Sequence, residues 1–133
     1  MTYLLDTNTC IFLIKRSPLR VLENLEAHSL SEIGISMITV AELEYGVEKS
    51  QQKGKNRQAL ERFLLPLELV EFNRAASQHY GEVRAELQRM GQPIGLMDML
   101  IAAHARSLGV TLVSNNLWEF SRVRGLKVED WTT

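Results

Sequence analysis

The chain has 133 residues, of which 45% are hydrophobic and 23% are charged, a composition that excludes an intrinsically disordered protein and suits one globular domain over residues 1–133. Its net charge of −1 argues against binding nucleic acid through a broad basic face, although a local rim of arginines is compatible with it. The only cysteine, Cys10, excludes an internal disulfide framework and suits a reducing compartment.

The first half of the chain alternates short apolar segments with amphipathic ones. A strand is expected at residues 2–5, then a helix over Thr7–Lys15 and a second helix from Pro18 to about His28. A strand at 33–37 and a helix from Thr39 to about Gln52 follow. The alternation predicts βα units rather than hairpins.

The second half continues the alternation. We expect a helix over 55–65 that ends before Pro66, a strand at 69–72, and a long helix that Asn73 caps and Gly91 ends. A helix over 97–108 and strands at 111–114 and 126–128 complete the chain. Strands separated by helices predict an α/β fold with a mostly parallel sheet and helices on both faces.

No basic segment followed by an apolar run begins the chain, and no apolar run approaches the length of a membrane span. We therefore expect a cytoplasmic protein without membrane segments.

Acidic and amide side chains follow several of the predicted strands. Asp6 comes directly after the first strand, Glu42 lies in the first turn of the helix after the second, and Asp98 lies in the first turn of a later helix. Asn116 and Glu119 follow the strand that ends at Val113. Because the carboxyl ends of parallel strands meet at one edge, these oxygens are expected to converge and to bind Mg²⁺ or Mn²⁺.

Each of these residues also has a purely structural explanation. Asp6 can cap the following helix, Glu42 can complete a capping box with Thr39, and Asp98 can favour its helix dipole. Glu119 can be an ordinary surface charge. The coincidence of four such placements at one sheet edge favours the metal site.

Other chemistry is poorly supported by the sequence. The three histidines, His28, His79 and His104, fall on predicted helices without metal-ligand spacing, and no phosphate-binding glycine loop occurs. Cys10 lies in an apolar helix and is interpreted as a core residue. Trp118 lies beside the acidic edge and suits either packing or base stacking.

Four segments, in this order and spacing, resemble the PIN-domain ribonucleases, and most closely the VapC toxins of bacterial toxin–antitoxin pairs. They are LLDTN from residue 4, ITVAELEYG from 38, PIGLMDMLIAAHA from 93 and LVSNN from 112, and the resemblance extends to the ending GLKVEDW from 125.

The resemblance implies a PIN-like three-layer α/β/α sandwich and a Mg²⁺- or Mn²⁺-dependent endoribonuclease toxin, with transfer RNA the favoured substrate. Catalytic positions then fall on Asp6, Glu42, Asp98 and Glu119. Asp6 and Asp98 would bind the metal, with Glu42, Asn116 and Glu119 binding it directly or through water. Asn116 stands where many PIN domains have aspartate, and Leu96 replaces a common proline.

The same resemblance implies a homodimer and a small VapB-like antitoxin whose tail covers the site. A hydrophobic groove for that tail is expected from the helix Cys10–Ile14 with leucines and a phenylalanine of neighbouring helices, namely Leu22, Leu25, Leu60, Phe63 and Leu64. The alternative is that these side chains serve only the chain's own core.

Two other functions are compatible with parts of the pattern. A PIN-fold module that binds RNA or a partner without catalysis would keep the fold, but the intact carboxylates argue against it. A metal-dependent phosphatase with an aspartate nucleophile after the first strand would need a second aspartate where Asn8 stands.

Overall fold

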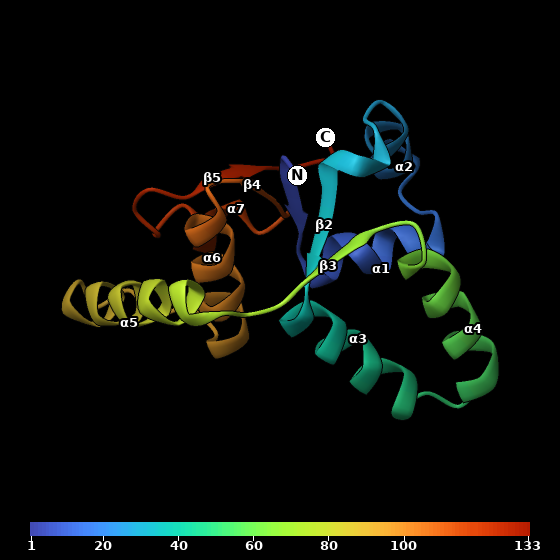
Figure 1. Ribbon diagram of the computed structural model, residues 1–133, viewed down its shortest axis with the longest axis horizontal. Helices are drawn as coiled ribbons and strands as arrows, with labels where there is room; N and C mark the ends of the chain where they lie inside the picture. Colours follow the sequence, from blue (N-terminus) through green and yellow to red (C-terminus); the bar gives the residue numbers. More distant parts are fainter.

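Five short strands form one parallel sheet in the order β3-β2-β1-β4-β5 in the computed structural model, which describes residues 1–133 (Figure 1). The strands are β1 (Tyr3–Leu5), β2 (Ile33–Ser36), β3 (Glu68–Val70), β4 (Thr111–Val113) and β5 (Lys127–Glu129). Every neighbouring pair is parallel, so the predicted mostly parallel sheet is confirmed.

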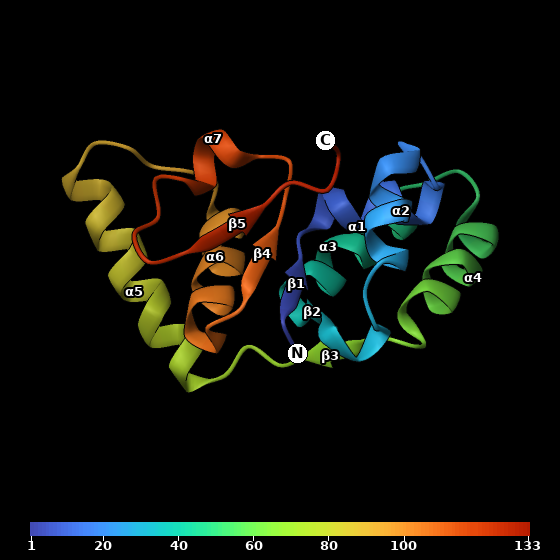
Figure 2. The same ribbon diagram turned by 90° about the horizontal axis from the view of Figure 1, so that it is seen from above.

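Helices cover both faces of this sheet, as the sequence predicted (Figure 2). On one side lie α1 (Thr7–Lys15), α2 (Leu19–Glu26), α3 (Met37–Glu48) and α4 (Lys53–Leu64). On the other side lie α5 (Arg74–Arg89), α6 (Leu96–Leu108) and the short α7 (Leu117–Phe120). The result is a three-layer α/β/α sandwich, and none of its helices combines the length and the apolar character that crossing a membrane requires.

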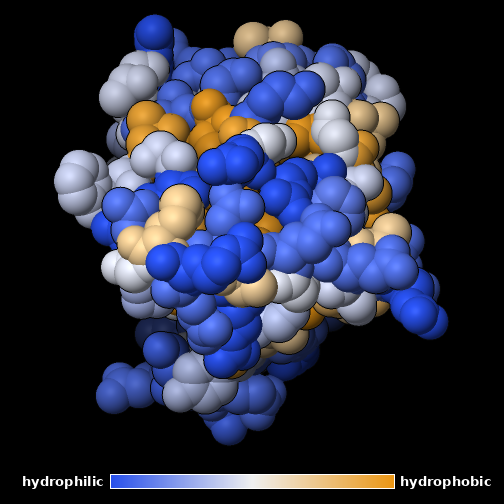
Figure 3. Space-filling model, turned by 90° about the vertical axis from the view of Figure 1, so that its left-hand side faces the viewer, coloured by the Kyte–Doolittle hydropathy of each residue, from blue (hydrophilic) through white to orange (hydrophobic).

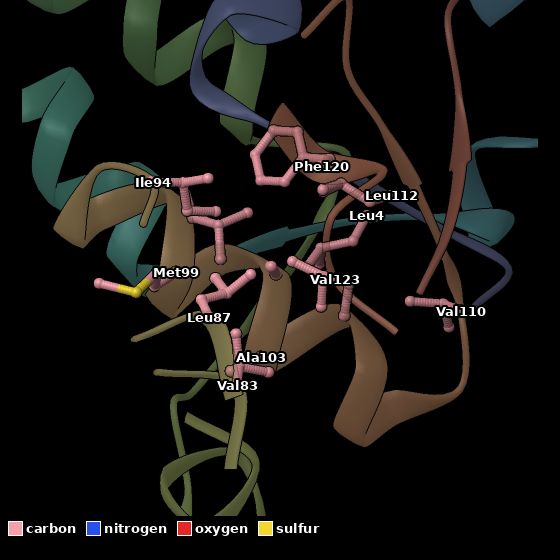
Figure 4. Packing of buried hydrophobic residues seen from close by; sticks show 13 residues of the cluster. Leu4, Val83, Leu87, Ile94, Met99, Ala103, Val110, Leu112, Phe120 and Val123 are labelled. Carbon is pink, nitrogen blue, oxygen red and sulfur yellow. The ribbon is translucent and has the colours of Figure 1, made fainter. Parts of the chain in front are cut away.

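The alternation of side chains along β1 explains why the core has two halves. Leu4 points into a cluster formed with α5, α6 and α7, whereas its neighbour Leu5 points into a cluster formed with α1 to α4. In the first cluster Phe120 is fully buried and packs with Leu4 and Leu112 from the sheet (Figure 4). This packing anchors α7 to the sheet edge that carries the acidic residues.

Local capping defines several helix ends. Asn73 begins α5 as predicted, and its Oδ1 accepts a hydrogen bond of 3.0 Å from the Ala76 N–H. Gly109 ends α6 with a φ of 69°, a backbone conformation that favours glycine.

Two features of the structure differ from the sequence prediction. The helix α7 and a short 3-10 helix at Leu30–Glu32 were not predicted, because segments of three or four residues show no periodicity. The helix α3 begins at Met37, not Thr39, because Ser36 at the end of β2 caps it through a 3.0 Å bond from the Ile38 N–H.

Candidate active site at the carboxyl edge of the sheet

The strand order reverses its direction between β1 and β4. The chain proceeds from β1 outward to β2 and β3, and then returns to the opposite side of β1 to form β4. Such a reversal leaves a crevice outside the carboxyl ends of the two strands, where open α/β sheets bind their ligands. Leu5 and Val113 are paired in the sheet, so the residues that follow them, Asp6 and Ser114, begin at neighbouring positions of this crevice.

Asp6 follows β1 directly at this edge of the sheet and is only 4% exposed. Its Oδ1 caps α1 by accepting a 2.8 Å hydrogen bond from the Thr9 N–H, which confirms the capping interpretation. Burial raises the pKa of Asp6, and hydrogen bonds from Ser114 and Thr9 lower it in part. The capping bond fixes the carboxylate and occupies Oδ1 alone, so capping and metal binding are compatible.

Glu42 lies in the second turn of α3, one turn later than predicted, because the helix begins at Met37. Its Oε1 accepts a 2.6 Å hydrogen bond from the Thr7 hydroxyl at the start of α1. The capping-box interpretation with Thr39 is therefore wrong: Thr39 is fully buried inside the helix, and its hydroxyl has no hydrogen-bond partner. Glu42 is directed toward the first turn of α1, where Asp6 is the cap.

Asp98 is the third residue of α6, directly after an N-terminus that no side chain caps. It is half-buried. Burial, and after it the negative charges of Glu119, Asp6 and Glu42, raises the pKa of Asp98 to about 6. Glu119, Asp6 and Glu42 all act on Asp98, so carboxylates from the end of β1, α3, α6 and α7 lie at the same edge of the sheet.

Glu119 and Asn116 reach this region from α7. Glu119 is half-buried and is the strongest of the three charges acting on Asp98. Asn116 lies at the N-cap position of α7 without a side-chain capping bond, and its backbone N–H donates to the Ser114 hydroxyl at 2.9 Å. Its amide is thus not used to cap the helix.

The four carboxylates carry negative charge that no side chain of the protein neutralises. None of them takes part in the ion pairs of the molecule, which all lie elsewhere. Three or more acidic, histidine or cysteine side chains are nowhere gathered closely enough to enclose an ion as they stand. The region is therefore an open cluster of repelling oxygens rather than a closed metal cage.

Sequence reasoning did not assign roles to Thr7 and Ser114. Thr7 orients Glu42, a contact between residues 35 positions apart, and Ser114 lies near enough to Asp6 to lower the pKa of its carboxyl. The positions of both residues in the sequence could have indicated these roles, because Thr7 follows Asp6 directly and Ser114 follows β4, which pairs with β1. Only the strand order shows that these positions meet.

The remaining candidates have the ordinary roles that were expected of them. Cys10 is fully buried in the core. His104 is buried and shares a 2.8 Å hydrogen bond with Ser36, and His79 accepts one of 2.9 Å from Arg106. His28 lies beyond the end of α2, where it stacks on the buried Trp131.

A groove with an apolar first hollow lies between α1, α3 and α4, next to Glu42 of the acidic cluster. It consists of two adjoining hollows of about 370 and 440 Å³ that share Ile14 and Ala59, and Glu42 lines the first. The predicted contributions of Leu60 and Phe63 are confirmed. Leu22, Leu25 and Leu64 do not line it, because they pack against the core beneath.

A family model described as the PIN domain matches residues 3–126. The tRNA(fMet)-specific endonuclease VapC of Shigella flexneri is 44% identical over 132 residues, which are 99% of each chain.

Solved structures give the same result for the three-dimensional fold. A chain in the crystal structure of DNA-bound VapBC from Salmonella typhimurium superposes with a TM-score of 0.93 at 44% identity, covering 98% of both chains. A chain of VapBC2 from Rickettsia felis, bound to a DNA fragment from its promoter, gives 0.91 at 43% identity, with 98% of this chain and 99% of that chain covered.

Proposed function

The chain belongs to the PIN-domain family, and from this premise we propose that it is an endoribonuclease toxin of a toxin–antitoxin pair. The full-length identity of 44% to a VapC endonuclease supports this function, and the acidic cluster at the switch point supplies a matching site. The names of two such relatives specify tRNA(fMet), so we propose transfer RNA as the substrate and the cytoplasm as the place of action.

We further propose that the enzyme depends on Mg²⁺ or Mn²⁺. The donors are all carboxylate and amide oxygens, which hard divalent cations prefer. The raised pKa of Asp98 records repulsion that a cation would relieve, so the residues fit such an ion in chemistry and in charge. When bound, the ion makes water a better nucleophile near neutral pH and offsets negative charge on the phosphate.

We propose the following roles for the residues of the site. Asp6, fixed by its capping bond, and Asp98, at the start of α6, would hold the ion. Glu42, which Thr7 orients, and Glu119 would accept the proton of the attacking water or hold that water in line with the scissile bond. Asn116 would donate a hydrogen bond to a phosphate oxygen. Hydrolysis by water leaves a 5′-phosphate and a 3′-hydroxyl.

The observation that carries this proposal is the placement of Asp6, Glu42, Asp98 and Glu119 at the carboxyl edge of the sheet, where the strand order reverses between β1 and β4. The test is cleavage of total tRNA with Mn²⁺ by the wild type and by Asp98→Asn, which keeps the shape and removes the charge. We expect loss of cleavage by at least a hundredfold. Glu23→Gln, an exposed carboxylate on α2, serves as the control and should cleave normally. Wild-type cleavage by a folded Asp98→Asn, or cleavage in excess EDTA, would contradict the proposal.

We propose the apolar groove between α1, α3 and α4 as the docking site of the antitoxin's tail. The solved VapBC relatives are complexes of this kind, and the groove here leads from exposed surface to Glu42. A segment seated in it would therefore also cover the acidic cluster. We also propose a homodimer, which agrees with the family resemblance.

The groove is tested by introducing a charge into it. Ile14→Glu places a carboxylate where both hollows meet and should abolish rescue of cell growth by the co-expressed antitoxin. Leu65→Glu is the matched control, because Leu65 is 86% exposed just beyond α4 and does not line the groove. Equal rescue of both variants would show that the antitoxin binds elsewhere.

A further inference from the structure

The helix α7 exposes a large aromatic side chain directly beside the acidic cluster. Trp118 is 78% exposed, whereas the other tryptophan, Trp131, is 2% exposed. The position of α7 is fixed, because Phe120 is fully buried in the core. Trp118 is thus an exposed aromatic ring on a helix whose position is fixed, and packing within the chain does not explain it.

Next to Trp118 the surface is hollowed. A cavity of about 400 Å³ lies between α7 and the loop that joins α5 to α6, and the two segments lie close together in Figure 2. Its lining residues are Gly91, Gln92, Pro93, Trp118, Ser121 and Arg122. The volume lies within the range of small-ligand pockets, and the lining is mixed, with polar and apolar surface in similar amounts.

The one charged residue that lines this hollow is Arg122. Arg122 is held in place by a 3.1 Å hydrogen bond from its Nη1 to the Pro93 carbonyl, and its guanidinium lies 5.8 Å from the centre of the Trp118 ring. No carboxylate lines the hollow, and Arg89 lies in the last turn of α5 just before the loop. The face of the molecule seen from the α5 side of Figure 1 is largely hydrophilic, with hydrophobic residues gathered mainly in a band across its upper part (Figure 3).

We propose that Trp118 and Arg122 form a nucleotide subsite, in which a base of the RNA substrate stacks on the indole and a backbone phosphate contacts the guanidinium. This inference rests on the proposed ribonuclease function and assigns the binding of substrate beside the scissile bond. A base offers the flat π-surface that an exposed indole stacks on, and a phosphate is the anion that an arginine fork fits.

A nucleic acid fits this hollow better than a protein segment does. The first hollow of the groove between α1, α3 and α4 is strongly apolar and suits a peptide, whereas this hollow combines one aromatic ring with a cation and has no aliphatic side chains other than Pro93 in its lining. Arg122 covers one face of the indole and leaves the exposed remainder of the ring for a base. Stacking is tolerant of base identity, so the subsite holds and positions the strand without reading its sequence.

The two tryptophans allow a direct measurement. Transfer RNA is titrated into Asp98→Asn, which binds without cutting, and tryptophan fluorescence is recorded. Because Trp131 is buried, quenching reports on Trp118, and we expect saturable quenching that disappears in Asp98→Asn with Trp118→Phe. In filter binding, Trp118→Phe should keep most of the affinity, whereas Trp118→Leu should lose on the order of tenfold, since leucine is apolar but cannot stack.

A matched control comes from a second exposed aromatic–cation pair. Tyr45 on α3 is 66% exposed with the Lys49 ammonium 5.0 Å from its ring centre, and Tyr45→Leu should bind RNA normally. Wild-type affinity of Trp118→Leu would overturn the subsite. The subsite would also be overturned if Trp118→Leu lost affinity and changed oligomeric state together, because Trp118 would then belong to an interface between copies of the protein. If the unaltered protein with Mn²⁺ cuts no RNA, the ribonuclease proposal itself fails.

Discussion

Asp98→Asn is predicted to stabilise the metal-free protein while it abolishes cleavage. In the absence of a cation, the Asp98 charge is partly desolvated and repelled by Glu119, Asp6 and Glu42, which together raise its pKa to about 6. An asparagine of nearly the same shape carries none of this repulsion. A residue that we propose to be required for activity is therefore expected to cost stability when no cation is present.

The pH dependence follows from the direction of the shift. In the unfolded chain Asp98 has a pKa of about 3.9, so between pH 4 and pH 6 the folded state binds more protons than the unfolded state. The stability of the wild type relative to the variant therefore falls as the pH rises through this window. The full penalty is present above pH 6, roughly half of it remains at pH 5, and it vanishes below pH 4.

The size of the effect can be bounded. A shift of roughly two units corresponds to at most about 3 kcal/mol. Asp98 is only half-buried, and solvent screening reduces this bound. The α6 dipole favours a negative charge in its first turn by about 0.3–1 kcal/mol. We therefore expect Asp98→Asn to gain roughly 1 kcal/mol at pH 7.5, or roughly 3–5 °C in Tm for a domain of this size.

The assay is urea unfolding in EDTA at pH 7.5 and at pH 5, with the wild type, Asp98→Asn and the surface control Glu23→Gln. Comparison at each pH cancels the titration of other groups, including His104, whose pKa burial lowers. The control should be neutral at both pH values. The reasoning would be refuted if Asp98→Asn were no more stable than the wild type at pH 7.5. It would also be refuted if the gain in the free energy of unfolding at pH 5 were as large as the gain at pH 7.5.

Three further predictions concern residues around the site. Thr7→Val removes the hydroxyl that orients Glu42 and should lower kcat roughly tenfold at unchanged RNA affinity. Thr7→Ser keeps a hydroxyl and should keep the wild-type kcat. Equal rates for the wild type and both variants would exclude this role of Thr7. Leu60 is only 2% exposed, so Leu60→Ala leaves a void and should lower the free energy of unfolding in urea by about 2–5 kcal/mol. A free energy of unfolding within about 0.5 kcal/mol of the wild-type value would contradict this prediction. Cys10 is fully buried and burial raises its pKa, so a thiol reagent should label it only after unfolding; rapid labelling of the native protein would disprove this packing.

Much of the candidate site could be located from the sequence. Asp6 and Asp98 interrupt apolar segments, where a short carboxylate needs a cap or a cation, and in the structure both lie at the predicted edge. The order of βα units predicted the parallel sheet, because each apolar strand is followed by an amphipathic helix. Their roles in catalysis stay a prediction.

The capping of α3 shows where sequence reasoning failed. Ser36 and Thr39 are both good caps, and Thr39 has a glutamate three residues later. The deciding quantity is where β2 ends, and this depends on its pairing with β3 up to Ser36 and Val70. Ser36 therefore caps the helix, Thr39 is buried within it, and Glu42 is left to bind Thr7.

The sequence by itself determined the types of the elements and which residues end each strand, because periodicity, caps and turn residues act over a few neighbouring positions. Only the tertiary structure decided which of these ends meet. The reversal between β1 and β4 brings Ser114 to Asp6, and packing of α1 against α3 brings Thr7 to Glu42. It also left Trp118 exposed beside Glu119, since the burial of Phe120 fixes how α7 lies on the sheet edge. Contacts between distant segments depend on how whole faces pack, and no short stretch of sequence contains that information.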